Sequence, residues 1–274
     1  MSATLDVRGC DMFVPLVDLD STESASAIVG ALQTSGFLLL KSPLLPPTLL
    51  QRALAASKEV LLSPDAAKYG VQEHTATPPQ LPDPKRYALR NYKELPTLTP
   101  AAAPTSGEVL TELYDAMEEV KLQLLTAMAV GLNLNDPSCF IKLHQEKNNT
   151  LRLLHYLPVS ETQGNRCKEH SDYGSVTLLL TDGSPGLEAF NDKANRWVPV
   201  PHVEGAVVVN IGSLMSAWTK GSLRATLHRV AGPASQASDT EPEELRQACA
   251  MPRFSVAFFA DLDPGVELRQ VGRE

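Results

Sequence analysis

The sequence predicts a mainly β protein with flanking α-helices, in which an antiparallel sandwich or jelly roll follows N-terminal helices. Two observations support this prediction. After Thr150, seven short apolar runs follow one another, and Gly, Pro, Asn or Asp residues separate them, as expected for short strands. Before Thr150, apolar residues recur at helical spacing, most clearly between Gly107 and about Gly131.

The region before Thr150 combines short apolar segments with helix signals. A Pro-Pro pair at 46–47 can begin a helix, and Gly36 can end one. Eight prolines within residues 63–104 favour a long loop over regular structure. The elements expected here are an edge strand within 13–19, a helix ending at Gly36, a buried strand at 37–40, a helix over 46–62, the loop 63–106 and the helix 107–131.

The second half of the chain supplies the predicted sheet. A polar stretch at 231–252 contains four acidic residues, and we expect it to be a surface excursion with a short helix. We therefore expect a single domain over 1–274, in which 1–148 packs as a helical and loop region on a core at 149–264. The expected strands are 151–157, 175–180, 187–190, 197–200, 206–211, 223–230 and 253–259.

Composition narrows the class of protein. The chain has 274 residues, is 43% hydrophobic and 20% charged, and carries a net charge of -8, which argues against nonspecific nucleic-acid binding. Its four cysteines form no Cys-x-x-Cys pair. Residues 1–6 do not resemble a secretory signal, and the apolar runs are too short for a membrane helix. We expect a cytoplasmic monomer that acts on a small molecule, without nucleic-acid or membrane partners.

Three residues form a candidate metal site. His170 and Asp172 are two positions apart, which places both side chains on one face if the segment is a strand. His228 follows 58 residues later, in another predicted strand. Two histidines and one carboxylate can bind one face of an octahedral metal and leave three positions open, a geometry diagnostic of non-haem Fe(II) oxygenases. The same set also serves catalytic zinc, so a zinc hydrolase is an alternative.

A candidate anion site begins the last predicted strand. Arg253, Ser255 and Ala257 would share one face of that strand. If that face is interior, the buried guanidinium requires an anionic partner, because an unpaired buried charge is costly. Arginine suits bidentate binding of a carboxylate, and a serine hydroxyl can add a hydrogen bond. The pattern fits a dicarboxylate ligand and a structural ion pair with a protein carboxylate about equally well.

Several motifs, taken in order, resemble the isopenicillin N synthase-like branch of the 2-oxoglutarate/Fe(II) oxygenases. The resemblance covers nearly the whole chain, from Pro15-Leu16-Val17-Asp18-Leu19 and Gly36-Phe37-Leu38-Leu39-Leu40 onward. The motifs that carry it are Leu151-Arg152-Leu153-Leu154-His155-Tyr156, Glu169-His170-Ser171-Asp172-Tyr173-Gly174, Gly186-Leu187-Glu188-Ala189, Trp197-Val198-Pro199-Val200, Val207-Val208-Val209-Asn210-Ile211-Gly212, Thr226-Leu227-His228-Arg229-Val230 and Arg253-Phe254-Ser255.

This resemblance implies a double-stranded β-helix (jelly roll) and an enzyme that couples oxidation of a small molecule to conversion of 2-oxoglutarate and O2 into succinate and CO2. Hydroxylation, desaturation or cyclisation would be the outcome. It implies that His170, Asp172 and His228 ligate iron. It also implies that Arg253, Ser255 and Tyr156 hold the distal carboxylate of 2-oxoglutarate. The sequence departs from the family pattern where Leu154 replaces a frequent Asn and where the segment between His228 and Arg253 is unusually long.

The resemblance also places a charged and aromatic loop near the mouth of the pocket. Its members could bind an anionic substrate, although a solvated loop with two anchoring tyrosines explains the pattern equally well. A jelly-roll binding protein with a vestigial site, or a relative that uses no 2-oxoglutarate, also remains open. The candidate substrate residues are Arg86, Tyr87, Arg90, Tyr92 and Lys93.

Overall fold

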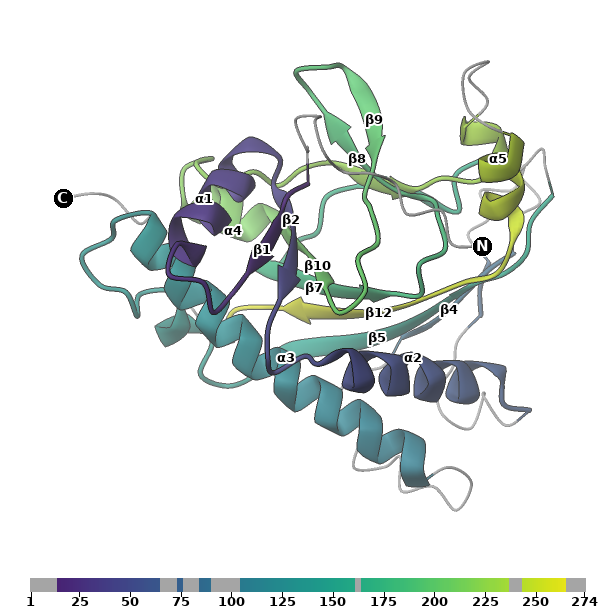
Figure 1. The fold of residues 1–274 in the computed structure, drawn as a ribbon, viewed down its shortest axis with the longest axis horizontal. Helices are drawn as coiled ribbons and strands as arrows, with labels where there is room; N and C mark the ends of the chain where they lie inside the picture. Colours follow the sequence, from purple (N-terminus) through teal and green to yellow (C-terminus); the bar gives the residue numbers. More distant parts are fainter. Residues whose placement is uncertain are drawn as a thin grey trace.

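The computed structural model describes residues 14–64, 73–75, 84–89, 104–160, 164–236 and 243–264. Two β-sheets form its centre and helices flank them (Figure 1). The major sheet has the strand order β1-β2-β10-β7-β12-β5-β4-β3, and the minor sheet has the order β6-β11-β8-β9. All pairings are antiparallel except that of β1 with β2. The predicted double-sheet jelly roll is therefore confirmed.

The strand bounds agree closely with most of the apolar runs. The strands are β1 (Leu16–Asp18), β2 (Phe37–Lys41), β3 (Glu73–Thr75), β4 (Pro84–Leu89), β5 (Asn149–Tyr156), β6 (Cys167–His170), β7 (Val176–Thr181), β8 (Leu187–Asn191), β9 (Arg196–Pro199), β10 (Val207–Ile211), β11 (His228–Val230) and β12 (Arg253–Ala260).

Helices α2 (Pro47–Leu62) and α3 (Pro104–Gly131) lie along one face of the major sheet, against β5, β7 and β12 (Figure 1). Apolar residues at helical spacing on α3, including Met117 and Leu124, are fully buried in the cluster that also contains the apolar side chains of these strands. Packing on this outer face leaves the opposite face of the sheet for a pocket. The remaining helices are α1 (Ser24–Thr34), α4 (Ser213–Trp218), α5 (Glu243–Ala250) and the short 3-10 segments Ile141–Leu143 and Pro233–Gln236.

The structure corrects the predicted loop at 63–106. It contains β3 and β4, and β4 pairs with β5, so the N-terminal half contributes strands at both edges of the major sheet. Proline density is a poor guide here, because a strand tolerates proline at its first residue and Pro84 is the first residue of β4.

The predicted strand at 223–230 is also shorter than expected, since β11 covers only its last three residues. The residues just before β11 form hydrogen bonds with the last turn of α1 and with the residue that follows that helix. The backbone amide of Arg224 donates to the Leu32 carbonyl, and the Thr226 hydroxyl donates to the Ser35 carbonyl. These bonds replace a sheet neighbour for this segment.

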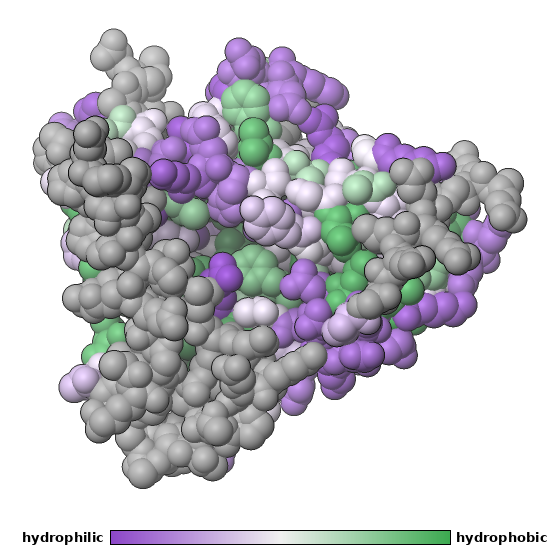
Figure 2. All heavy atoms as spheres, turned by 180° about the vertical axis from the view of Figure 1, so that it is seen from behind, coloured by the Kyte–Doolittle hydropathy of each residue, from purple (hydrophilic) through white to green (hydrophobic). Residues whose placement is uncertain are grey.

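The outer surface is mixed in character. On the face seen from behind, apolar side chains lie among hydrophilic ones near the middle of the surface (Figure 2). Among the described residues, no helix is both long and apolar enough to span a bilayer.

Candidate active site

A pocket of about 300 Å³ lies between the two sheets. The major sheet lines it with every second residue of two neighbouring strands, as the period of a β-strand requires. The minor sheet contributes His170 and His228 from β6 and β11. The residues of the major sheet that face the pocket include Arg152, Leu154 and Tyr156 on β5 and Arg253, Ser255, Ala257 and Phe259 on β12.

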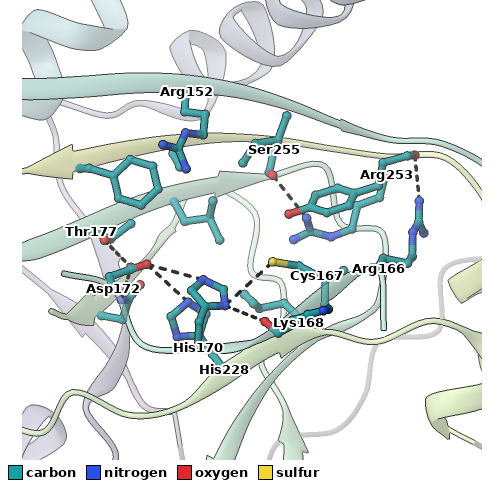
Figure 3. A pocket seen from close by; sticks show the side chains of 18 of the residues that line it. Arg152, Arg166, Cys167, Lys168, His170, Asp172, Thr177, His228, Arg253 and Ser255 are labelled. Atoms are coloured by element: carbon teal, nitrogen blue, oxygen red, sulfur yellow. Dashed lines mark hydrogen bonds and ion pairs between the residues drawn. The ribbon is translucent and has the colours of Figure 1, made fainter. Parts of the chain in front are cut away.

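The three predicted metal ligands meet at one end of this pocket (Figure 3). Oδ1 of Asp172 lies 3.7 Å from Nε2 of His170 and 3.7 Å from Nε2 of His228. One ligand atom from each residue lies within 4.8 Å of the other two, and among the described residues this is the cluster of histidine, cysteine and acidic groups that could hold a metal ion. Two nitrogens and one oxygen at such separations fit a facial metal triad.

Strand pairing brings these ligands together. His228 is the first residue of β11 and pairs directly with His170, the last residue of β6. The register of this strand pair shifts between His228 and Val230. Bulges of this kind re-aim side chains and are frequent beside active sites. Asp172 lies beyond the end of β6, not on it as the spacing suggested, and its carbonyl accepts from the backbone amide of Ser213. The loop that carries the carboxylate is thus fixed by the start of α4.

Both imidazoles are oriented for metal binding. Nδ1 of His170 lies 2.7 Å from the Lys168 carbonyl, and Nδ1 of His228 lies 3.2 Å from the Thr226 carbonyl. A carbonyl can only accept, so Nδ1 carries a proton in each ring, and Nε2 is the ring nitrogen that faces Asp172. Metal-ligating histidines commonly donate their second ring N–H in this way.

The two histidines differ in their protonation. A hydrogen bond to the Cys167 thiol, together with the Lys168 carbonyl and the Asp172 charge, raises the pKa of His170 to about 9. Burial lowers the pKa of His228. Since only neutral imidazole binds a metal, an ion that enters at neutral pH must displace the proton on Nε2 of His170.

The carboxylate of Asp172 is held by two further side chains. Its Oδ2 accepts from the Thr177 hydroxyl at 2.6 Å and from Nδ2 of Asn210 at 2.7 Å, and Asp172 itself is only 8% exposed. Oδ1 is thereby turned toward the two imidazoles. Sequence reasoning missed these two supports, because Thr177 and Asn210 read as ordinary strand residues within apolar runs.

Loss of the Thr177 support should weaken metal binding without changing the ligand set. We expect Thr177→Val to reduce Fe(II) affinity by roughly 10- to 100-fold, as is typical when a partner of a metal ligand is removed. Anaerobic titration calorimetry with Fe(II) measures the change. Thr181→Val is the matched control, because Thr181 lies on the same strand and bonds to His202 instead. Equal losses in both variants would contradict the assigned role of Thr177.

Arg253 lies across the pocket from the triad and is only 1% exposed (Figure 3). Its Nη1 donates to the Ser255 hydroxyl at 3.3 Å, whereas Nε and Nη2 have no hydrogen-bond partner among the described residues. A structural ion pair would have supplied those partners, so that alternative is not supported in the described chain. Because a buried charge is costly unless an anion pairs with it, the arrangement fits the distal carboxylate of a bound diacid.

Tyr156 stands beside this guanidinium. It pairs with Arg253 across β5 and β12, and Cζ of Arg253 lies 5.3 Å from the centre of its ring. Burial raises the pKa of the Tyr156 hydroxyl, which therefore stays protonated and able to donate a hydrogen bond. The three residues predicted to hold 2-oxoglutarate thus lie together at the end of the pocket away from the metal triad.

The predicted substrate residues are only partly placed. Arg86 and Tyr87 belong to β4, whose side chains are not described, and Arg90, Tyr92 and Lys93 lie outside the described residues. The pocket also contains two arginines that the sequence reasoning did not assign to it, Arg152 and Arg166.

Sequence comparison relates the second half of the chain to a known family. A family model described as the 2OG-Fe(II) oxygenase superfamily matches residues 136–261. A 2-oxoglutarate-dependent dioxygenase of Aspergillus rugulosus (htyE) is 37% identical over 158 residues, which are 56% of this chain and 46% of that protein. The clavatol oxidase of Penicillium crustosum (claD) is 31% identical over 206 residues, 70% and 56% of the two chains. The chain spans about half the length of the curated relatives it matches.

Solved structures extend the likeness to nearly the whole chain. A full-length Neurospora crassa protein, solved in complex with alpha-KG, superposes with a TM-score of 0.75 and 25% identity, over 94% of this chain and 87% of the other. The Arabidopsis thaliana dioxygenase for auxin oxidation 1 shares the fold at 18% identity, with a TM-score of 0.75 over 93% and 95%. Together with the metal triad and the buried anion site, these similarities relate residues 136–261 to the 2OG-Fe(II) oxygenase superfamily and extend the shared fold to nearly the whole chain.

Proposed function

We propose that this chain oxidises a small organic molecule in a reaction that depends on Fe(II), 2-oxoglutarate and O2. One observation carries the proposal: a facial set of metal ligands and a buried guanidinium face each other across one pocket, and two donor atoms of that guanidinium have no partner among the described residues. A metal site alone fits many reactions. The guanidinium adds a binding site for a carboxylate that is separate from the metal.

Each group then has a stated task. His170, Asp172 and His228 would hold the iron, and Arg253, Ser255 and Tyr156 would hold the distal carboxylate of 2-oxoglutarate. Fe(II) with bound 2-oxoglutarate and O2 supplies the oxidation, in which the co-substrate is converted to succinate and CO2. The chain's own part is to fix the ligand geometry and to exclude water from the reacting groups.

The apolar wall of the pocket supports water exclusion. Phe37, Leu179, Leu187 and Val230 line it together with the polar groups. The Phe37 ring meets the edge of the His228 ring at a centroid distance of 5.5 Å, which also restricts the rotation of that ligand. The bound substrate would share about 300 Å³ with 2-oxoglutarate, so we propose a small molecule.

We further propose that the chain works as one oxygenase domain, because one apolar cluster joins the N-terminal helices to the major sheet. The substrate-contacting role of Arg86 and Tyr87 also remains a proposal. For Tyr87 it is supported by the pairing of β4 with β5, in which Tyr87 is the partner of the pocket residue Leu154.

A succinate-release screen tests the proposal. Purified protein is given Fe(II), 2-oxoglutarate and O2 with a panel of small metabolites, and succinate is quantified for each. We expect slow release without substrate and faster release with the right class of molecule. A metal assay on the same preparation addresses the zinc hydrolase. Tight zinc binding with no 2-oxoglutarate turnover for any panel member would contradict the oxygenase.

A further inference from the structure

Arg166 is a buried arginine that none of the roles above uses. It lies directly before β6 and is only 2% exposed. Its guanidinium donates to four backbone carbonyls at 2.8–3.0 Å: Nη1 to Cys249 and Met251, and Nη2 to Tyr156 and Leu157. A planar fork of donors suits this task, since it can bind carbonyls of two separate segments at once.

Those four carbonyls belong to the two segments that carry the co-substrate site. Tyr156 is the last residue of β5 and Leu157 follows it, while Cys249 lies near the end of α5 and Met251 lies in the link from α5 to Arg253. Cζ of Arg166 also lies 5.5 Å from the centre of the Tyr156 ring. The guanidinium therefore fixes the ends of both strands at the point where the predicted carboxylate anchor begins (Figure 3).

The backbone of Arg166 is attached to the other sheet. Its amide donates to the Val230 carbonyl at 2.7 Å, two residues after the ligand His228, and β6 continues from it to His170. One residue thus joins the metal-ligand strands of the minor sheet to the anchor strands of the major sheet. The two sheets have no strand pairing with each other among the described strands, so side-chain contacts hold them together: an apolar cluster with members on both sheets, and the bridge that Arg166 forms.

We propose that Arg166 is a positioning residue that sets the distance between the metal ligands and Arg253, and so the length of the dicarboxylate that the pocket accepts. The inference rests on the proposed function. A diacid that bridges a metal and a guanidinium spans a fixed gap, and one methylene more or less changes its fit. A bridge that fixes the gap therefore determines which length of dicarboxylate binds best. The overall stability of the fold does not determine that preference.

Equilibrium binding tests this role without turnover. Mn(II)-loaded protein is titrated calorimetrically with 2-oxoglutarate and with 2-oxoadipate, which is one methylene longer, and Mn(II) binding is measured separately. We expect Arg166→Met to weaken 2-oxoglutarate binding by about 10-fold or more, since a charged carboxylate contact is misplaced. We also expect the wild-type preference for 2-oxoglutarate over 2-oxoadipate to shrink by about 10-fold. Mn(II) affinity should change by less than the roughly 10-fold that loss of a direct ligand support causes.

Two variants separate positioning from charge and from stability. Arg166→Lys keeps a cation but cannot reach carbonyls of both segments as a fork does, so it should show the same narrowed preference. Arg229→Met is the control. Arg229 is in the same strand pair, but its guanidinium bonds to Glu188, pairs with Glu169 of β6 at 3.5 Å and lies over Trp197, and none of these residues carries the proposed chemistry. This variant should lose thermal stability and keep the wild-type preference.

The outcomes are distinct. The role is supported if both Arg166 variants show a smaller preference for 2-oxoglutarate over 2-oxoadipate and Arg229→Met keeps the wild-type preference. If the Arg166 variants keep the wild-type ratio of 2-oxoglutarate to 2-oxoadipate affinity, the role is overturned, whatever their melting temperature. If Arg166→Met does not fold, the same ratio measured in Arg166→Lys alone overturns it. Wild-type protein that binds Mn(II) but neither diacid would overturn the proposed function itself and this inference with it.

Discussion

Replacement of Asp172 by alanine should abolish Fe(II)-dependent succinate formation. The substitution removes the one carboxylate of the triad, whose Oδ1 lies 3.7 Å from both imidazole nitrogens. Loss of a partner behind a ligand typically costs 10- to 100-fold in metal affinity, so loss of the ligand itself should cost more than about 100-fold. Anaerobic Fe(II) titration and succinate quantification, at saturating 2-oxoglutarate, measure the two effects.

The fold should survive this change. Thr177 and Asn210 lose their shared acceptor, which costs about 1–3 kcal/mol for each of the two buried donors left unsatisfied. Asp192→Ala is a matched control, because Asp192 is an exposed aspartate that pairs with Arg224 and does not line the pocket. It should retain wild-type turnover and iron binding. Wild-type succinate release by Asp172→Ala, confirmed as folded by circular dichroism, would remove the metal assignment.

Periodicity predicted the sheet well where burial is one-sided or complete. The runs that became β5, β7, β10 and β12 are central strands of the major sheet, and their apolar side chains pack under α2 and α3 or face the pocket. It failed in the Pro-rich segment and in the connection before β11. β4 begins at a proline and belongs to a Pro-rich segment, and the residues before β11 bond to the α1 end, so neither carries the alternation of a two-sided strand.

The site shows the same division between local and distant information. The candidate residues His170, Asp172, His228 and Arg253 could be picked out because their chemistry is unusual at those positions. The fold then brings His228 next to His170 by pairing β6 with β11. Their supports could not be found in this way. Thr177, Asn210 and Arg166 act by contacts that span 5, 38 and up to 85 residues of sequence, and nothing in the residue types marks those partners.

Replacement of Arg253 by methionine should remove selective binding of the distal carboxylate. The substitution keeps a long side chain in a site that is 1% exposed but deletes the Nε and Nη2 donors that have no partner in the described chain. Truncation of one member of a buried charge pair costs about 2–5 kcal/mol. This corresponds to roughly 30- to 4,000-fold weaker binding of 2-oxoglutarate. Calorimetry on Mn(II)-loaded protein gives the affinity, and the KM for 2-oxoglutarate in the succinate assay should rise with it.

A ligand without the distal carboxylate isolates the contact. 2-Oxopentanoate has the same carbon chain and the same metal-binding end as 2-oxoglutarate. It should bind wild-type protein far more weakly than 2-oxoglutarate does. In Arg253→Met the two ligands should bind with almost equal affinity. Arg253→Lys keeps the charge without the bidentate fork and should recover only part of the difference. If the two ligands differ as much in Arg253→Met as in wild-type protein, the carboxylate is held elsewhere. The Arg253 guanidinium, which has no ion-pair partner among the residues that the structure describes, would then need a different anion, because burial of that charge without one is too costly for a stable fold.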